Sequence, residues 1–469
     1  MTINDFIQAK TRGRYTQIVE MPQEEGGFGR LYRAQDTQNP QTEVCIKVIK
    51  PNLSKDLQLK LWNDEVLALG RYRNRSGIVH LVDEQYQFTK DEPYCFLVME
   101  YIHGKRLGAS KYRIELDVEE DFAILLIFQL CSVMFSIHQR GDYHQDIFPD
   151  NIKVRDHDLI LLDLGGMREA ERRSGTIIFG GEMYSPPEVS PTRLRMKRFR
   201  TLRKQKMGSF ESADIFSIGA IFYELIMGVQ FFESVEQSNQ LKEYIYDYYT
   251  DPDMVKRMKK EYKEAIDAVK RNRDNFYNFL QQYQVPPELC ECLASTLSLN
   301  PPKRPSIEEL LRHLFPYLLR RAAEYYQQQN WEQAQLWVRY LERHFDEIRL
   351  ECTDNDGVLR QKMGQHLLTH FPCYVQSCLS AGGARFQQGQ FEAAQQMFLK
   401  TREVLAGFEQ EHSGPQWNTL LLKIINNLAA CHYKLRRCDE AVHLFKTLST
   451  ADGNFGQIIN HNLQVCAAS

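Results

Sequence analysis

The first hundred residues alternate between short apolar runs and turn residues, a pattern typical of β-structure. Residues 15–50 read as strands and turns, with a glycine-rich loop at 24–29. Apolar positions at helical spacing predict a helix over 53–70, and strands are expected again at 79–83 and 94–101. The start of the chain is therefore predicted to be mainly β-structure with one helix.

Helical periodicity dominates from Val118 onward. The longest apolar run is Phe122–Ile137, which Gln129 and Ser132 interrupt. A helix that spans a bilayer needs about 20 residues with few polar ones. We therefore interpret this run as a buried core helix and expect no transmembrane segment. A loop-rich stretch over 142–190 follows and interrupts the helical pattern.

The chain changes character after Phe315, where prolines nearly vanish and glutamines and alanines become frequent. Three segments of this tail each have a small residue, a turn about seven residues later and an alanine five residues beyond the turn. This resembles the tetratricopeptide helix–turn–helix pattern, in which small residues let paired helices approach closely. The segments are Ala322–Ala334, Gly382–Ala394 and Ala429–Ala441.

The spacing of these segments departs from the tetratricopeptide family. Their closing alanines are 60 and 47 residues apart, whereas the family period is about 34 residues. The helices are therefore longer, or the repeats are interrupted. A generic helical bundle is the alternative interpretation.

Composition excludes several classes of protein. The 469 residues include 43% hydrophobic and 25% charged side chains, as in ordinary folded proteins, which excludes global disorder. Lys and Arg number 58 and Asp and Glu number 61, and the resulting net charge of −3 excludes a polycation of the histone type. It does not exclude a local basic patch. The length corresponds to about three average domains.

Cysteine usage and the start of the chain bear on the compartment. The eleven cysteines are scattered, odd in number and never spaced as CxxC, so neither a disulfide framework nor a zinc site is indicated. Residues 1–14 mix polar and charged side chains without an apolar segment, so no secretory signal is predicted there. We therefore expect a protein of the reducing cytoplasm.

The loop-rich stretch contains the residues that point to chemistry. Asp146 is followed five residues later by Asn151, and the apolar run Leu159–Leu162 leads into an Asp-Leu-Gly motif that begins at Asp163. Phosphoryl transfer needs one carboxylate near the attacking hydroxyl. It also needs an amide oxygen and a second carboxylate that hold magnesium against the nucleotide phosphates. The spacing of these residues fits that requirement.

With these motifs the chain resembles the eukaryotic-type (Hanks-type) protein kinases over about residues 15–315. Val44–Lys47 matches the strand motif whose lysine holds the α- and β-phosphates. Glu65 lies where the helical partner of that lysine belongs, and Glu24 replaces the first glycine of the phosphate-binding loop.

The resemblance implies a role for each matching residue. Asp146, Lys47 and Glu65 are the implied catalytic residues, and Asn151 and Asp163 are the implied metal ligands. The residues implied to bind ATP, besides Lys47, are Gly26, Gly27 and Gly29 over the phosphates and Met99, Glu100, Tyr101 and Ile102 in the hinge that receives adenine.

Three later motifs distinguish this family from the aminoglycoside- and choline-type kinases, which share the pattern around Asp146 but not these motifs. Ser185–Glu188 resembles the end of an activation segment. Asp214–Gly219 resembles the helix motif whose aspartate anchors the catalytic loop. Asn300–Ser306 resembles the motif whose arginine makes a buried pair with the activation-segment glutamate, and such pairs can be bidentate. The implied supporting residues are His144, Glu188, Asp214 and Arg304.

Two positions depart from the family's catalytic loop. Gln145 replaces the arginine that meets a phosphate on the activation loop, so we expect no strict requirement for phosphorylation there. Phe148 replaces the lysine that neutralises the transferring phosphate, and such a loss can lower the rate on the order of 10²-fold. This leaves open a slow kinase, a kinase with a substitute basic residue, and a nucleotide-binding pseudokinase scaffold. Pseudokinases usually lose Lys47, Asp146 or Asp163; all three are present, which favours an active enzyme.

An insertion at 191–207 is rich in basic residues and, in the family, borders the substrate groove. It is either a solvated loop or an electrostatic site for an anionic partner. Because Phe199 is its only aromatic residue, a base-stacking surface is not indicated, and we favour an acidic protein segment over nucleic acid. The basic residues are Arg193, Arg195, Lys197, Arg198, Arg200, Arg203, Lys204 and Lys206.

The sequence thus predicts an α+β two-lobed protein kinase fold followed by an all-α helical-repeat (tetratricopeptide-like) domain. The predicted activity is transfer of the ATP γ-phosphoryl group to a Ser or Thr hydroxyl of a protein, with Mg²⁺ or, in its place, Mn²⁺. The combination resembles bacterial Hanks-type kinases, whose repeats dock a partner protein or a second copy of the chain. The expected segments are an N-terminal tail at 1–14, an N-lobe at 15–100, a C-lobe at 101–316 and repeats at 317–469.

Overall fold

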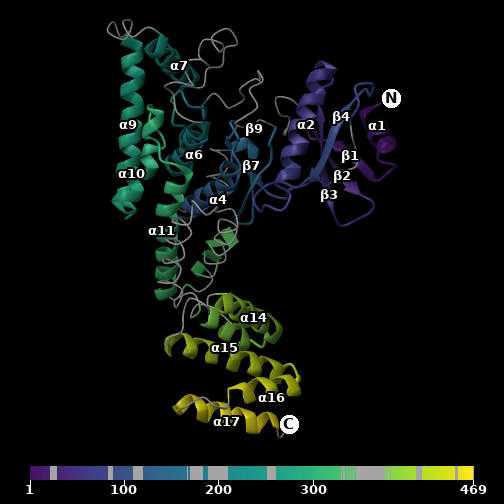
Figure 1. Cartoon of the computed structure of the whole chain (residues 1–469), viewed down its shortest axis with the longest axis vertical. Helices are drawn as coiled ribbons and strands as arrows, with labels where there is room; N and C mark the ends of the chain where they lie inside the picture. Colours follow the sequence, from purple (N-terminus) through teal and green to yellow (C-terminus); the bar gives the residue numbers. More distant parts are fainter. Residues whose placement is uncertain are drawn as a thin grey trace. The chain divides into compact units, whose positions relative to one another are not determined.

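The computed structural model forms two compact units, one made of Met1–Leu314 and the other made mainly of the residues from Phe315 onward (Figure 1). The structure describes the chain except for residues 22–28, 83–87, 109–119, 166, 170–182, 189–209, 251–259, 329, 331–332, 335, 338–339, 342, 345–374, 376–377, 381, 408–414, 449–452 and 468–469.

The first unit opens with a four-stranded antiparallel sheet of order β1-β2-β3-β4. In β3 the buried residues Val44, Ile46 and Val48 alternate with Cys45 and Lys47, because successive side chains of a strand point to opposite faces. One face of β3 therefore enters the core, and the other presents Cys45 and Lys47. The strands are β1 (Tyr15–Glu20), β2 (Gly29–Asp36), β3 (Glu43–Ile49) and β4 (Cys95–Glu100).

Helix α1 (Ile3–Lys10) lies within the segment that the sequence presented as an N-terminal tail. Thr2 caps it: the Thr2 hydroxyl accepts a hydrogen bond from the Asp5 amide, and the Asp5 carboxylate accepts one from the Thr2 amide. Phe6 and Ile7 are buried in the same core as the inner face of the sheet. Residues 3–10 are therefore part of the N-lobe, because their two adjacent apolar side chains complete its core.

Helix α2 (Lys55–Arg71) corresponds to the helix predicted at 53–70. Its buried residues recur at helical spacing and form one face of the helix. Trp62 Nε1 on this face donates a hydrogen bond to the backbone oxygen of Phe96 in β4, at 2.8 Å. The buried residues are Gln58, Leu61, Trp62, Glu65, Ala68 and Leu69. The one carboxylate among them, Glu65, needs a buried partner.

The rest of the first unit is mainly helical, and α4 (Glu120–Gln139) packs against α6 (Phe210–Met227). Among the described residues one helical stretch, Asp121–Gln139, has the length and apolar composition of a membrane span, but 83% of it is buried inside the unit. This agrees with the interpretation of 122–137 as a core helix. The other α-helices that the structure describes here are α7 (Val235–Thr250), α9 (Lys260–Gln282), α10 (Pro287–Ser295) and α11 (Ile307–Gln327), whose residues from Phe315 onward belong to the second unit.

Two small sheets flank the loops that contain Asp146 and Asp163. One has the strand order β5-β7-β8, and the other pairs β6 with β9. Their strands are β5 (Lys105–Arg106), β6 (Asp142–Tyr143), β7 (Ile152–Arg155), β8 (Asp158–Leu161) and β9 (Arg168–Glu169). Of the strand expected at 79–83, the described residues show one isolated bridge, between Leu81 and Met99.

The second unit contains helices that pack in succession, each against the next, from α14 to α17 (Figure 1). Ala429, Ala441 and Phe445 are fully buried in the core that α15, α16 and α17 share. A Cβ atom on Gly382 would lie 2.4 Å from the ring of Phe398 in α14, so this ring packs directly against the backbone at Gly382. The helices are α14 (Phe391–Gly407), α15 (Pro415–Lys434), α16 (Cys438–Thr447) and α17 (Gly453–Ala467).

Candidate active site

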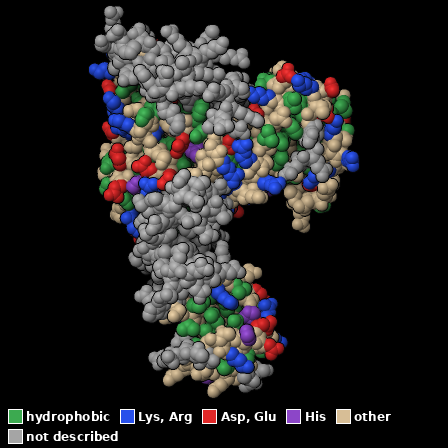
Figure 2. Space-filling view, in the orientation of Figure 1, with side chains coloured by type: hydrophobic (Ala, Val, Ile, Leu, Met, Phe, Trp, Pro, Cys, Tyr) green, Lys and Arg blue, Asp and Glu red, His purple; other side chains and the backbone are tan. Residues whose placement is uncertain are grey.

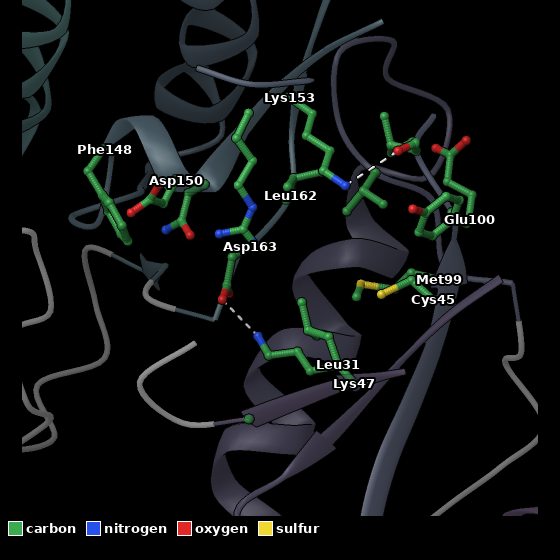
Figure 3. Close-up of a pocket in the computed structure, with 16 residues that line it drawn as sticks. Leu31, Cys45, Lys47, Met99, Glu100, Phe148, Asp150, Lys153, Leu162 and Asp163 are labelled. Carbon is green, nitrogen blue, oxygen red and sulfur yellow. Dashed lines mark hydrogen bonds and ion pairs between the residues drawn. The ribbon is translucent and has the colours of Figure 1, made fainter. Parts of the chain in front are cut away.

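A cavity of about 220 Å³ in the first unit brings together residues of the N-lobe sheet and of the loops around β7 and β8 (Figure 3). The four residues that the sequence places in an adenine-binding hinge line it. Four other residues with implied roles in nucleotide or metal binding line it as well. These eight residues are Met99, Glu100, Tyr101 and Ile102 of the hinge, and Gly29, Lys47, Asn151 and Asp163.

Lys47 is held between two carboxylates that lie far away in the sequence. Its Nζ atom lies 2.7 Å from Glu65 Oε1 on α2 and 2.8 Å from Asp163 Oδ2, which follows β8. Figure 3 draws the contact with Asp163. Burial by itself would lower the pKa of Lys47, but the two carboxylates raise it, so the ammonium stays charged. Lys47 reaches Glu65 because side chains alternate along β3 and because Glu65 lies on the buried face of α2.

The two carboxylates beside Lys47 respond differently to their surroundings. Burial favours a raised pKa for both. For Asp163 the Lys47 ammonium and the Gly165 amide, which donates to Oδ1 at 2.8 Å, outweigh burial and lower the pKa. For Glu65 burial prevails and raises the pKa, since Lys47 and Asp163 act on it in opposite directions. Of the two carboxylates beside Lys47, Asp163 is therefore the one whose pKa favours the ionised form.

Asp146 and Asn151 belong to the loop between β6 and β7. Asn151 Nδ2 donates to the backbone oxygen of Asp146 at 3.0 Å and lies 3.5 Å from Asp146 Oδ2. Burial, with a further contribution from the Asp163 carboxylate, raises the pKa of Asp146 to about 7. A carboxylate with this pKa can accept a proton near neutral pH.

Asp214 in α6 fixes the backbone of this loop. Its Oδ2 atom accepts from the His144 amide at 2.9 Å and its Oδ1 atom accepts from the Gln145 amide at 2.8 Å. Burial lowers the pKa of His144. Nδ1 of the neutral ring can accept a hydrogen bond from the Asp146 amide nitrogen, which lies 3.3 Å away. The loop thus approaches the cavity with Asp146 in a fixed place.

Gln145 adopts a left-handed backbone, with φ at +65°, and its side chain turns back toward α6. Its Nε2 atom donates to the backbone oxygen of Phe210 at 3.0 Å and lies 3.3 Å from Asp214 Oδ1. Gln145 therefore places a neutral amide, hydrogen-bonded to α6, where the family has a charged arginine.

Arg304 and Glu188 form the buried bidentate pair that the motifs implied. Arg304 Nη1 and Nη2 lie 2.5 and 2.9 Å from the two Glu188 oxygens, and the arginine side chain is fully buried. Its Nε atom donates to the backbone oxygen of Ser298 and its Nη1 atom to that of Ser212. The Arg304 guanidinium thus joins three chain segments: its own, the one that contains Glu188 and the one that contains Ser212.

Asn151 and Asp163 have the donor atoms that magnesium prefers, an amide oxygen and an ionised carboxylate. The Asn151 amide nitrogen is used within the loop, so its oxygen is the atom that can face a cation. Among the residues that the structure describes, no group of three or more His, Cys, Asp or Glu side chains is arranged to hold a metal. These two donor atoms fit an ion that takes its remaining ligands from phosphate oxygens and water.

Several predicted residues lie outside the described part of the chain. These are Gly26 and Gly27 of the phosphate-binding loop and the whole basic insertion at 191–207. On the face drawn in Figure 2, acidic and basic side chains are interspersed over the described surface of the first unit. Nine of the eleven cysteines lie among the described residues, and seven of these are buried.

The structure adds two cationic residues that the sequence analysis did not assign. Arg106 and Lys153 face each other across β5 and β7 and both line the cavity. Lys153 alternates with the apolar Ile152 and Val154 in β7, so strand alternation was an available signal for it. Arg106 required the pairing of β5 with β7. The other unassigned lining residues are Leu31, Cys45, Val79, Phe148, Asp150 and Leu162.

Comparison with known proteins agrees with this geometry. The protein kinase domain family matches residues 24–316. Serine/threonine-protein kinase D of Synechocystis sp. is 29% identical over 229 residues, which cover 46% of this chain and 42% of that protein. Serine/threonine-protein kinase PknA of Corynebacterium glutamicum is 26% identical over 218 residues, which cover 43% and 41% of the two chains.

A eukaryotic relative matches a longer stretch. Mitogen-activated protein kinase 12 of Rattus norvegicus is 26% identical over 304 residues, 62% of this chain and 75% of that protein. By contrast, the chain spans about two fifths of the length of the bacterial kinases it matches. The family match covers more than half of the chain and includes every residue of the cavity. The chain belongs to the protein kinase family, with an N-lobe sheet, a helical C-lobe and a further helical region after them.

Proposed function

We propose that this chain is an ATP-dependent protein kinase that phosphorylates Ser or Thr hydroxyls. The observation that carries the proposal is the pairing of Lys47 Nζ with both Glu65 and Asp163, at 2.7 and 2.8 Å. A lysine held in this way is placed to receive nucleotide phosphates beside the metal-binding carboxylate. Catalysis of phosphoryl transfer is largely positioning and charge stabilisation, which such a rigid charged network provides.

In this proposal Asp146, Asn151, Asp163 and Lys47 each have one task. Asp146 orients the substrate hydroxyl and accepts its proton, consistent with a pKa of about 7. Asn151 and Asp163 hold Mg²⁺, which supplies charge neutralisation to the β- and γ-phosphates when bound. Mn²⁺ is expected to substitute, since it prefers the same oxygen ligands. Lys47 holds the phosphates.

One observation favours a second candidate, a nucleotide-binding pseudokinase scaffold. Phe148 lines the cavity at the position where the family has a phosphate-neutralising lysine. Against this candidate, Arg106 and Lys153 bring positive charge to the same cavity from β5 and β7. We favour the active enzyme, because the network of Lys47, Glu65 and Asp163 is assembled.

Autophosphorylation and transfer to acidic and basic protein substrates, with labelled ATP and Mg²⁺, test the proposal. Asp146→Asn and Asp163→Asn are expected to abolish incorporation. Asp156→Asn is the matched control: Asp156 is exposed in the turn between β7 and β8, with a φ of +58° that asparagine tolerates. If wild type binds Mg²⁺–ATP but transfers no phosphate, the scaffold is the correct function.

We propose further that the second unit is a tetratricopeptide-like repeat that docks a partner protein or a second copy of the chain. The three segments identified in the sequence share one turn geometry, which supports this. The amides of Asn330, Gln390 and Arg437, at the same place in each segment, donate to the carbonyl five residues earlier, at 2.9 Å in each case. The closing alanines, all fully buried, are Ala334, Ala394 and Ala441.

The basic insertion at 191–207 is proposed to attract an acidic substrate segment. Replacing its eight basic residues by glutamine is expected to slow phosphorylation of an acidic peptide more than that of a neutral one, and the difference is expected to shrink with added salt. Equal turnover of both peptides by the variant and wild type would remove this role. Cytoplasmic localisation and a bacterial source stay predictions.

A further inference from the structure

The end of helix α2 is tied to the catalytic segment through one buried carboxylate. Arg71 Nη1 and Tyr72 OH lie 2.6 and 2.7 Å from the same atom, Asp142 Oδ2. Arg71 is the last residue of α2, and Tyr72 is its C-cap. Tyr72 and Asp142 are each 1% exposed, so the bond between them is shielded from water, whereas the Arg71 side chain is 40% exposed and reaches Asp142 from the surface. We name Arg71, Tyr72 and Asp142 the helix clamp.

Asp142 belongs to the backbone that carries the catalytic loop. It opens β6 and pairs with Glu169 of β9, the strand that follows the Asp163 segment. It lies two residues before His144, whose amide Asp214 holds, and four residues before Asp146. The helix clamp therefore joins α2 to the two segments that supply Asp146 and Asp163.

The position of Glu65 depends on where α2 lies. Glu65 and Tyr72 share the buried face of the helix and are separated by seven residues, or about 10 Å along the axis. On the other side of Glu65, Trp62 ties the helix to β4 through the backbone oxygen of Phe96. The helix is thus held before and after Glu65, whose oxygen lies 2.7 Å from Lys47.

Neighbouring side chains reinforce the helix clamp. Arg140 Nη1 donates to the backbone oxygen of Arg71 at 2.9 Å, and its guanidinium lies 5.0 Å from the centre of the Tyr72 ring. Arg75, just after the helix, donates to Ser132 and Ser136 of α4, both at 2.7 Å. The buried Asp142 carboxylate accepts from one guanidinium and one hydroxyl. Losing either donor would leave its negative charge less well compensated.

We propose that the helix clamp positions Glu65 for its ion pair with Lys47, so that Arg71, Tyr72 and Asp142 are positioning residues for phosphoryl transfer. The inference rests on the kinase activity proposed above. Gln145 presents a neutral amide bound to α6, where an arginine would meet a phosphate on the activation segment. The clamp supplies an anchor for α2 that needs no such phosphate.

Two substitutions test the proposal through steady-state kinetics. Arg71→Met and Tyr72→Phe each remove one donor to Asp142 and keep most of the side chain's bulk. Each is expected to lower kcat about tenfold, as for the loss of one charge-assisted hydrogen bond, with a smaller change in the KM for ATP. Arg73→Met is the matched control, because Arg73 is exposed and lies in the same turn. It is expected to keep kcat within about twofold.

A second background separates positioning from simple stabilisation. In Glu65→Gln the same clamp substitutions are expected to cause no further loss of kcat, since they act through Glu65. An equal tenfold loss in both backgrounds would overturn the proposal, as would unchanged kcat in the original background.

Hydrogen exchange gives a readout that does not depend on turnover. Amides of α2 are expected to exchange faster in Arg71→Met than in wild type, with those of α9 unchanged. If wild type transfers no phosphate, the kinase activity fails, and this measurement still decides whether the clamp holds α2. Unchanged exchange in α2 would contradict the clamp.

Discussion

The catalytic cleft and the C-terminal helices are organised by opposite means. The cleft unites Lys47, Glu65 and Asp163, which are up to 116 residues apart, through ion pairs with N–O distances of 2.7 and 2.8 Å. In the second unit, small residues such as Gly382 and Ala394 lie where the helices pack closely. Ion pairs hold the first region together. The second depends on small residues that let the helices pack closely.

This difference determines how each region fails. Removing one charge from the cleft leaves another charge buried without its partner, which lowers both activity and stability. Adding one methyl group between the helices produces overlap without any change in charge. Activity should therefore be most sensitive to charge in the first unit, and stability most sensitive to volume in the second.

Lys47→Met is expected to have the largest effect. It removes the phosphate-binding ammonium and should lower kcat/KM for ATP by about 10²–10³-fold. It also leaves Glu65 and Asp163 adjacent without a cation, so the melting temperature should fall. Lys90→Met, at an exposed lysine of the N-lobe, is the control and should change neither quantity. Normal turnover in Lys47→Met would contradict the assignment of the cleft.

Arg304→Leu is expected to destabilise the first unit by about 3–5 kcal/mol, since it leaves Glu188 buried and unpaired. Urea unfolding monitored by hydrogen exchange should place the loss in peptides of α6 and not in those of α15. The double variant Arg304→Leu/Glu188→Leu should recover part of the loss, because no charge is then left without a partner. A double variant no more stable than Arg304→Leu would mean that packing, rather than charge, holds these segments.

Gly382→Ala and Gly383→Ala should change stability in opposite directions. A Cβ on Gly382 would lie 2.4 Å from the Phe398 ring, whereas a Cβ on Gly383 would meet nothing within 4 Å. The first should destabilise the helices by about 1–3 kcal/mol, and the second should stabilise them by about 0.5–1 kcal/mol through helix propensity. Thermal unfolding measures both, and Mg²⁺–ATP binding should stay unchanged. The same sign for both variants would contradict the close approach.

The smallest expected effect is a pH dependence in the second unit. Burial lowers the pKa of His432, and Nε2 of the neutral ring lies 2.9 Å from the Gln395 amide nitrogen, from which it can accept. Because the unfolded chain takes up the proton first, stability should fall as pH drops through about 6.5, the ordinary histidine value. His432→Gln should show a shallower decline between pH 7.5 and 5.5 in urea unfolding. Identical slopes would assign the titration to another group.

Much of the cleft could be predicted from the sequence because its motifs are local. Val44–Lys47 and the loop from His144 to Asn151 each fix several residues within one strand or turn. The prediction for helix 53–70 succeeded for the same reason, since its buried residues repeat every three or four positions. Residues 1–14 appeared as a tail because two apolar residues form too short a pattern, although Phe6 and Ile7 complete a core.

The sequence by itself determined which residues could carry phosphoryl transfer and where a second helical region begins, because both are encoded in short-range spacing. Tertiary structure alone decided which distant charges meet: the helix clamp at Asp142 and the facing cations Arg106 and Lys153 depend on strand pairing and on helix placement. These contacts join residues that share no local period. A buried charge is stable only beside its partner, and the fold decides which partner that is.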